Sequence, residues 1–137
     1  MNAFKVTGLA AAGLLLATVA AMAATPPALY TQTQATAGAA VFAQSCAMCH
    51  GADLKGVAGP ALIGPTFAAA GNKYTVGSVF TEIAQQMPVS APGSLSHDQY
   101  TDIMAYILSK NGYPAGTAAL DYTAGMASTV PFVSQVK

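Results

Sequence analysis

Cys46, Cys49 and His50 are the residues of this chain whose types and spacing point most directly to chemistry. They form the pattern C-x-x-C-H, which is the attachment pattern of a c-type haem. Two thiols three positions apart lie within about one helical turn, so each can form a thioether to one of two vinyl groups on a porphyrin edge. His50 then lies under the iron, where its imidazole can bind as the proximal ligand. The sequence therefore predicts one haem c, with its iron, bound covalently through Cys46 and Cys49.

Two other interpretations of the cysteine pair are less well supported. A disulfide or a thioredoxin-like dithiol would be expected after a strand in a βαβ setting, and the sequence has neither signal. A structural zinc ion needs four ligands, and His97 is the only further Cys or His in the chain. The haem interpretation uses all of the motif and is the one we favour.

The N-terminal residues have the pattern of an export signal. Lys5 supplies a short positive region, residues 9–21 are apolar, and a small-x-small cleavage site ends at Ala23. We expect residues 1–23 to be a signal peptide that is removed, which makes the periplasm the expected location. An uncleaved membrane anchor over residues 6–24 is the alternative, because that apolar stretch is barely long enough to span a bilayer.

The charge composition limits the possible partners. The chain has five Lys and Arg against five Asp and Glu, and loss of Lys5 with the signal peptide leaves a net charge of −1. No basic cluster is present, so nucleic-acid binding is not supported. Strong electrostatic steering towards a partner is not expected either. A docking surface on this protein should be mostly apolar and uncharged.

Two helical patterns surround the haem motif and its downstream loop. The first covers about residues 36–46 and leads directly into the motif. The second begins after Thr75, a suitable N-cap, and carries apolar residues at the i, i+3, i+4 and i+7 positions of a buried face. It should end before Met87, which is followed by proline.

A third helical pattern is the best defined. Ser96 and Gln99 form a capping box at its start, and Asn111-Gly112 should end it. No alternating strand pattern and no internal repeat is evident. We therefore expect an all-α fold in which three main helices and long loops surround the haem.

With these features identified, the sequence from about residue 36 to residue 113 resembles the small class I cytochromes c. The resemblance implies that the first and last helices cross, with Gly38 and Phe42 packed against Ile103 and Tyr106. The residues that carry it, in chain order, are Gly38, Phe42, Cys46, Cys49, His50, Gly51, Gly59, Pro60, Leu62, Met87, Pro88, Ile103 and Tyr106.

The same resemblance implies roles for residues near the haem. The carbonyl of Pro60 should accept a hydrogen bond from Nδ1 of His50, which would fix the ring. The sixth iron ligand of the family is a methionine sulfur, and Met87 is the candidate because it lies in a loop between helices. Met126 and His97 are the weaker rivals for this position, whereas Met104 is better explained as a core residue.

Tyr74 and the end of the chain each allow two interpretations. Tyr74 could hydrogen-bond a haem propionate, or it could simply pack on the helix that follows it. We divide the mature chain into a cytochrome c domain at residues 24–113 and an irregular C-terminal extension at residues 114–137. The extension is too apolar for a free tail, so it wraps over the domain or docks on a partner, and we favour wrapping.

The expected function is electron transfer without substrate chemistry. An iron that keeps both His50 and a methionine has no vacant position and can cycle between Fe(III) and Fe(II). The protein would be a diffusible carrier or the electron-transfer subunit of a dehydrogenase, with a periplasmic dehydrogenase, a terminal oxidase or another cytochrome as redox partner. It loosely resembles cytochromes that serve quinoprotein alcohol dehydrogenases. The alternative is a peroxidase or gas sensor with an open sixth site.

Overall fold

A computed structural model of the chain describes residues 25–137, and its regular structure is helical. The elements in chain order are α1 (Gln32–Ser45), α2 (Ala47–His50), α3 (Pro65–Ala68), the 3-10 turn η1 (Ala70–Asn72), α4 (Val76–Gln86), α5 (His97–Lys110) and α6 (Tyr122–Met126). Within these residues no strand is formed, and no helix is long and apolar enough to cross a membrane. The predicted all-α class is confirmed. The predicted signal peptide at residues 1–23 lies outside the described residues.

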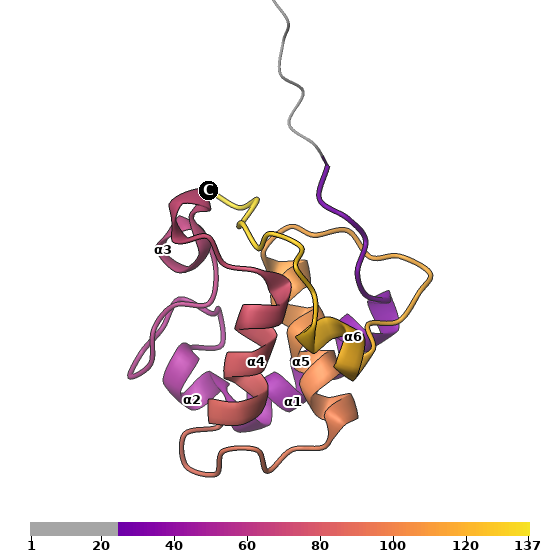
Figure 1. Cartoon of the computed structure of the whole chain (residues 1–137). Helices are drawn as coiled ribbons and strands as arrows, with labels where there is room; N and C mark the ends of the chain where they lie inside the picture. The colour runs from indigo at the N-terminus through magenta and orange to yellow at the C-terminus, as the bar shows by residue number, and fades with distance from the viewer. Residues whose placement is uncertain (1–24) are drawn as a thin grey trace, which may run out of the picture.

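Helices α1 and α5 cross at the centre of the molecule, although they are far apart in the sequence (Figure 1). A side chain at Gly38 would collide with the backbone carbonyl of Asp102, so the close approach of the two helices requires glycine. One turn further on, the rings of Phe42 and Tyr106 lie 5.3 Å apart between centroids. Ile103 is also buried at this crossing. The helix contact that the resemblance implied is therefore confirmed.

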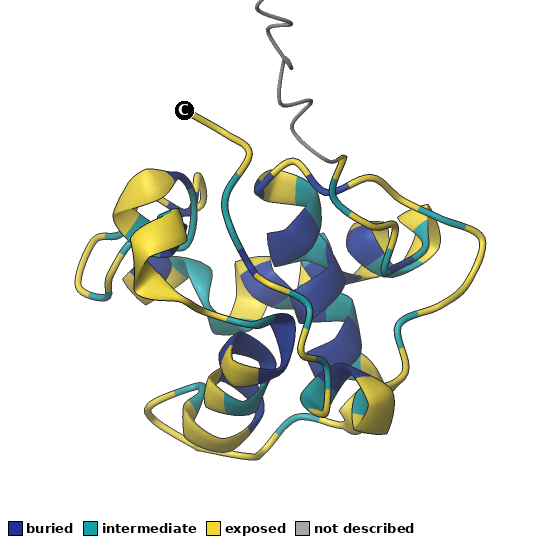
Figure 2. Ribbon diagram, turned by 45° about the horizontal axis from the view of Figure 1, so that its top comes forward, coloured by how far each residue is buried: buried dark blue, intermediate teal, exposed yellow. Residues whose placement is uncertain are grey.

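Helices α4 and α5 begin and end where their capping residues predict. The Thr75 hydroxyl accepts a 3.0 Å hydrogen bond from the Ser78 amide, and α4 ends at Gln86. The capping box of Ser96 and Gln99 is formed at the start of α5. After α5, Gly112 adopts a φ of 83°, a conformation that favours glycine. The buried sides of both helices face the interior (Figure 2).

The first helix begins earlier than predicted. We expected it to cover about residues 36–46, but α1 begins at Gln32 and ends at Ser45. Thr31 and Gln34 form a reciprocal capping box, with hydrogen bonds of 3.3 and 3.2 Å. This Thr-x-x-Gln pattern was present in the sequence and marks the true start of the helix.

The C-terminal extension also differs from the prediction in one respect. It is not wholly irregular, because the short helix α6 forms after Asp121, whose carboxylate accepts a 2.8 Å hydrogen bond from the Ala124 amide. The remainder runs back across α4 and ends beside α3 (Figure 1). Phe132 is fully buried there. The wrapping that we favoured is therefore observed.

Candidate haem site

The C-x-x-C-H motif follows α1 directly and forms the short helical turn α2. Cys46 follows the last residue of α1, and its amide donates a 2.9 Å hydrogen bond to the Phe42 carbonyl. The carbonyl of Cys46 then accepts a 2.9 Å hydrogen bond from the His50 amide, which closes the turn of α2. The backbone thus places both thiols and the imidazole on one turn, as the spacing predicted.

The His50 ring is held by a single backbone contact. Its Nδ1 lies 2.8 Å from the carbonyl oxygen of Pro60, and the side chain is largely buried. A carbonyl can only accept, so Nδ1 is the protonated nitrogen and Nε2 keeps its lone pair for a metal. The hydrogen bond that the resemblance implied is present. Gly59 permits it, because a Cβ at this position would approach the ring to 3.0 Å.

The loop after the motif folds back onto α2. The amides of Val57 and Gly59 both donate to the carbonyl of Cys49, at 2.9 and 2.8 Å, and the amide of Gly56 donates to the carbonyl of His50 at 2.8 Å. These bonds satisfy carbonyls that a helix of only four residues leaves without partners. They also bring Pro60 to the His50 ring.

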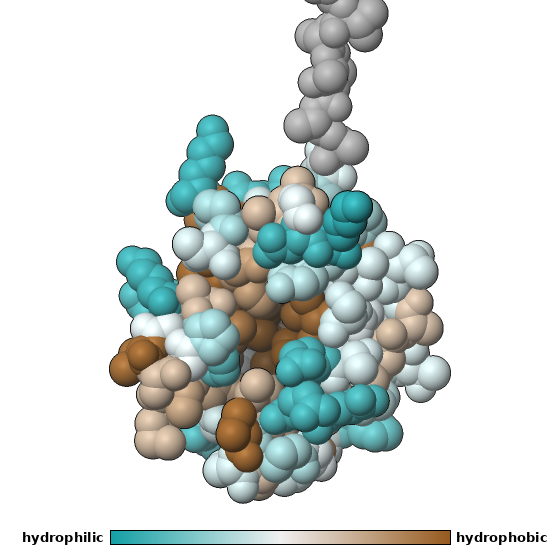
Figure 3. Space-filling view, turned by 60° about the vertical axis from the view of Figure 1, so that its left-hand side comes forward, coloured by the Kyte–Doolittle hydropathy of each residue, from teal (hydrophilic) through white to brown (hydrophobic). Residues whose placement is uncertain are grey.

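An apolar groove of about 890 Å³ opens beside the motif, and Figure 3 shows the hollow with apolar side chains inside it. Its volume lies within the range of about 300–1,000 Å³ that is common for cofactor sites. Among the described residues that line it, Glu82 supplies the only carboxylate. The lining residues are Phe42, Gln44, Ser45, Cys46, Met48, Cys49, His50, Pro60, Leu62, Phe67, Tyr74, Ser78, Val79, Glu82, Ile83, Met87, Pro88, Val89, Ser90, Ser94, Leu95, Ile103 and Ile107.

All six candidate site residues line this groove, namely Cys46, Cys49, His50, Pro60, Tyr74 and Met87. The groove therefore contains two thiols, an imidazole with a free nitrogen and a thioether, which is a donor set that suits a haem of the c type. Tyr74 is partly exposed, and its ring lies 6.5 Å from that of Phe67. It packs on the α3 segment that precedes it, and we had expected any packing to be on the helix that follows.

Neither Met126, a rival for the sixth ligand, nor Met104 lines the groove. The sulfur of Met126 lies 3.7 Å from the Thr81 hydroxyl. Met104 is fully buried in α5, as expected of a core residue.

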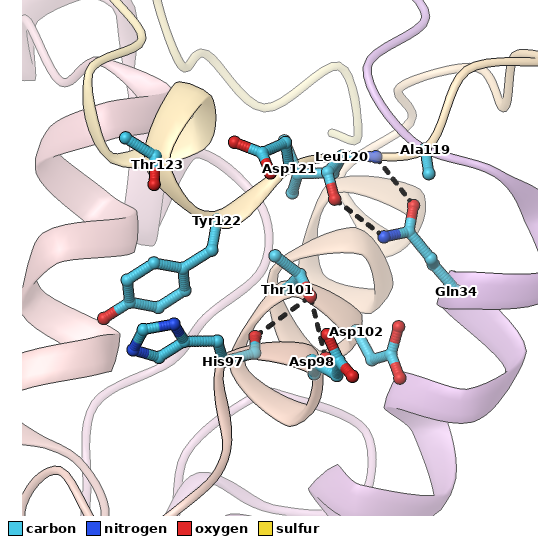
Figure 4. Close-up of a pocket in the computed structure, with 10 residues that line it drawn as sticks. All are labelled: Gln34, His97, Asp98, Thr101, Asp102, Ala119, Leu120, Asp121, Tyr122 and Thr123. Carbon is cyan, nitrogen blue, oxygen red and sulfur yellow. Dashed lines mark hydrogen bonds between the residues drawn. The ribbon is translucent and has the colours of Figure 1, made fainter.

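His97 lies in a second cavity, of about 570 Å³, between α1, the start of α5 and the C-terminal extension (Figure 4). Its ring stacks on that of Tyr122, with centroids 3.7 Å apart and planes within 5° of parallel. The side chain of Gln34 ties α1 to the extension by hydrogen bonds with both the amide and the carbonyl of Leu120. None of these residues belongs to the groove beside the haem motif.

Two residues that shape the groove were not identified from the sequence. The Tyr100 hydroxyl donates a 2.7 Å hydrogen bond to the backbone carbonyl of Met87. Asn111 is fully buried, and its amide group donates a 2.9 Å hydrogen bond to the carbonyl of Leu62. Each of these hydrogen bonds joins two segments that are separated in the sequence. The only signal for either in the sequence was a polar group within or beside the apolar face of a helix.

The protonation of Cys46 disfavours the dithiol interpretation. Burial, followed by the neighbouring Cys49, raises the pKa of this thiol to about 11. A reactive redox cysteine needs a lowered pKa, because the thiolate is the nucleophile. Before thioether formation, Cys46 is thus a protonated thiol at neutral pH.

The helical fold and the C-x-x-C-H turn beside an apolar groove define a small class I c-type cytochrome. Residues 33–107 match the family described as cytochrome C oxidase, cbb3-type, subunit III, and the chain belongs to that family. The family implies a covalently bound haem c, for which Cys46 and Cys49 have the required spacing, and electron transfer as the general role.

One of the solved chains similar to this one comes from the sulfane dehydrogenase SoxCD of Paracoccus pantotrophus. It is 26% identical, with a TM-score of 0.54, over 71% of this chain and 53% of the other. The present chain thus spans about half the length of the solved chain that it matches. Among curated proteins, no relative matches this chain.

Proposed function

We propose that this protein is a periplasmic, single-haem electron carrier or electron-transfer subunit with His50 and Met87 as axial iron ligands. The observation that carries the proposal is that one groove contains the C-x-x-C-H turn and Met87, which comes from a separate loop 37 positions after His50. The haem supplies one-electron cycling between Fe(III) and Fe(II). Cys46 and Cys49 hold it, and the chain has no role for a substrate in this proposal.

Each groove residue contributes to that role in a different way. Nε2 of His50 would bind the iron, while the carbonyl of Pro60 fixes the ring and would make it a stronger donor. The Met87 sulfur favours the ferrous state and raises the reduction potential. The apolar walls would keep water away from the iron, and this exclusion of water would also raise the reduction potential. Tyr74, at the edge of the groove, is a candidate donor to a haem propionate.

Export and location are part of the proposal. The N-terminal pattern of a positive residue, an apolar run and a cleavage site supports export with removal of residues 1–23. Covalent haem attachment outside the cytoplasm is consistent with this route. An N-terminal membrane anchor is the competing outcome.

The surroundings of the groove support docking through uncharged contacts. Met48 and Val89 both line the groove, yet they are 88% and 75% exposed. Large exposed apolar side chains at a site rim are typical of contact surfaces. The similarity to a dehydrogenase chain favours a dehydrogenase as electron donor, and the family description favours an oxidase as acceptor.

The decisive experiment replaces Met87 with Ala in the holoprotein. The red-region charge-transfer band from sulfur to ferric iron should vanish, the reduction potential should fall, and exogenous ligands should bind. Met104→Leu is the matched control, because a volume-conserving swap in the core should cost less than about 1.5 kcal/mol and keep the band. A band that survives Met87→Ala but is lost in Met126→Ala would transfer the ligand role to Met126. A wild-type protein without the band would favour the open-site peroxidase or sensor.

A further inference from the structure

Residues 128–135, which we call the C-terminal strap, lie outside the part of the chain that matches the family. They run along the start of α4 and then towards α3 (Figure 1). Both of those elements border the groove, because Phe67 of α3 and Val79 of α4 line it, as does Tyr74 between them. The strap itself contributes no lining residue, so any influence on the haem must act through that wall.

The strap completes the N-terminus of α4. The amides of Val76 and Gly77 donate to the carbonyls of Val130 and Ser128, at 2.8 and 3.0 Å. These amides belong to the first helical turn, where no carbonyl of the helix itself can reach them. Gly77 permits this contact, since a Cβ there would come within 2.6 Å of the Ser128 carbonyl oxygen.

The strap also supports the wall from behind. The Phe132 amide donates a 2.8 Å hydrogen bond to the Tyr74 carbonyl. The Phe132 ring is fully buried, and it meets the Phe67 ring edge-on with centroids 5.6 Å apart. The Phe132 ring also stacks on that of Tyr113, with centroids 5.5 Å apart. Phe67 therefore lies between the strap and the groove.

The far end of the strap is fixed at two further points. The Ser134 amide donates to the Ala68 carbonyl at 2.9 Å, and the Gln135 amide donates to the Asn111 carbonyl at the same distance. The Tyr113 hydroxyl donates to the Pro131 carbonyl and accepts from the Val133 amide, both at 3.0 Å. The strap is thus held along its length, and not only at Phe132.

We infer that the C-terminal strap is a positioning element for the haem: Phe132 holds the wall of Phe67 and Tyr74 against the cofactor and so limits the access of water to it. Water next to the haem stabilises the ferric state, which carries more charge than the ferrous state. A loosened wall must therefore lower the reduction potential. This inference rests on the proposed haem site in the groove.

The test measures the reduction potential and the red-region band in holoprotein variants. Phe132→Ala removes the support behind Phe67 and should lower the potential while the band remains, because Met87 is not touched. Phe132→Leu restores most of the side-chain volume and should bring the potential back towards the wild-type value. Gly77→Ala displaces the strap from α4 without altering any residue of the strap, and should shift the potential in the same direction as Phe132→Ala.

Leu108→Ala is the control for a general loss of stability. Leu108 is fully buried in α5 but does not line the groove, so its truncation should lower the melting temperature without moving the potential. The inference is overturned if Phe132→Ala shifts the potential no more than Leu108→Ala does. Should Phe132→Ala fail to fold, an unchanged potential in Gly77→Ala would overturn it as well. Wild-type protein lacking covalent haem or the red-region band would instead refute the proposed function.

Discussion

The Tyr100 hydroxyl and the Met87 backbone carbonyl form a 2.7 Å hydrogen bond that joins the first turn of α5 to the loop after α4. The same hydroxyl accepts a 3.4 Å hydrogen bond from the Leu95 amide. Both ends of the loop between α4 and α5 are therefore fastened to a single buried side chain. This arrangement positions the backbone from which Met87 enters the groove.

Replacing Tyr100 with Phe should release that loop while keeping the ring in the core. Loss of a buried hydrogen bond should lower the free energy of unfolding by about 0.5–1.5 kcal/mol. Imidazole should also displace the Met87 sulfur at lower concentration, which titration of the red-region band would measure. Tyr106→Phe is the control, since the Tyr106 ring packs against Phe42 at the helix crossing. Equal imidazole affinity in the two variants would contradict a role for Tyr100 in holding Met87.

Haem attachment should depend on Cys46 and Cys49. Haem should stay with the wild-type polypeptide through acid–acetone extraction and denaturing electrophoresis. The double replacement by Ala should leave little folded protein, because the groove loses the group that fills it. Free haem released from intact wild-type chains would contradict covalent attachment.

Export should leave a defined N-terminus. The mass of protein isolated from the periplasm should correspond to a chain that begins at Ala24 and carries one haem. Intact mass spectrometry makes this measurement directly. A chain that still contains Lys5 and fractionates with membranes would show that the N-terminal segment is an anchor.

Gly38→Ala should destabilise the crossing of α1 and α5. The new methyl group would meet the Asp102 carbonyl, so the helices must separate or shift, at a cost of about 1–3 kcal/mol. Chemical denaturation would measure the change. Gly71→Ala is the matched control, because a Cβ at Gly71 meets no atom within 4 Å and should change stability by less than about 0.5 kcal/mol. Similar losses in both variants would show that the crossing does not require glycine.

Asp102→Asn should stabilise the protein at neutral pH. Burial, followed by the nearby Asp98, raises the pKa of the Asp102 carboxyl above its ordinary value of 3.8. A carboxyl whose pKa is higher in the folded than in the unfolded state stabilises the fold fully only at a pH below its unfolded-state pKa. This stabilisation is lost as the pH rises through the folded-state pKa. The variant should therefore melt higher than wild type at pH 7, and this advantage should disappear at acid pH.

Asp53→Asn is the control for the effect at Asp102. Asp53 is exposed and lies 3.6 Å from Lys55, so its replacement should bring no gain at pH 7. An advantage for Asp102→Asn that is the same at pH 7 and at acid pH would show that ionisation is not its cause.

The sequence predicted those features that depend on neighbouring residues. The caps at Thr75 and Ser96 lie within one turn of the amides that they satisfy, so their patterns were readable. Helix α6 was missed because five residues are too few to establish a helical period. The capping box of Thr31 and Gln34 is equally local, but it lies before residues 36–46, on which the predicted first helix rested.

Long-range contacts could not be read in the same way. The strap reaches α4 through backbone amides and carbonyls, which every residue possesses and which carry no signature in a sequence. The contact of Tyr100 with Met87 depends on the path of the intervening loop. The contact of His50 with Pro60 was anticipated because a resemblance to a family supplied it.

That last contact has a consequence for how mutation can act on the haem ligand. The acceptor for His50 is a main-chain oxygen, so a substitution at position 60 changes the side chain but does not delete the acceptor. The hydrogen bond is therefore protected from point mutation at its own position. It remains vulnerable one residue earlier, because a Cβ at Gly59 would press against the imidazole. A mutation can therefore disturb the His50 ring by moving the loop that carries Pro60, but it cannot replace the carbonyl that the ring contacts.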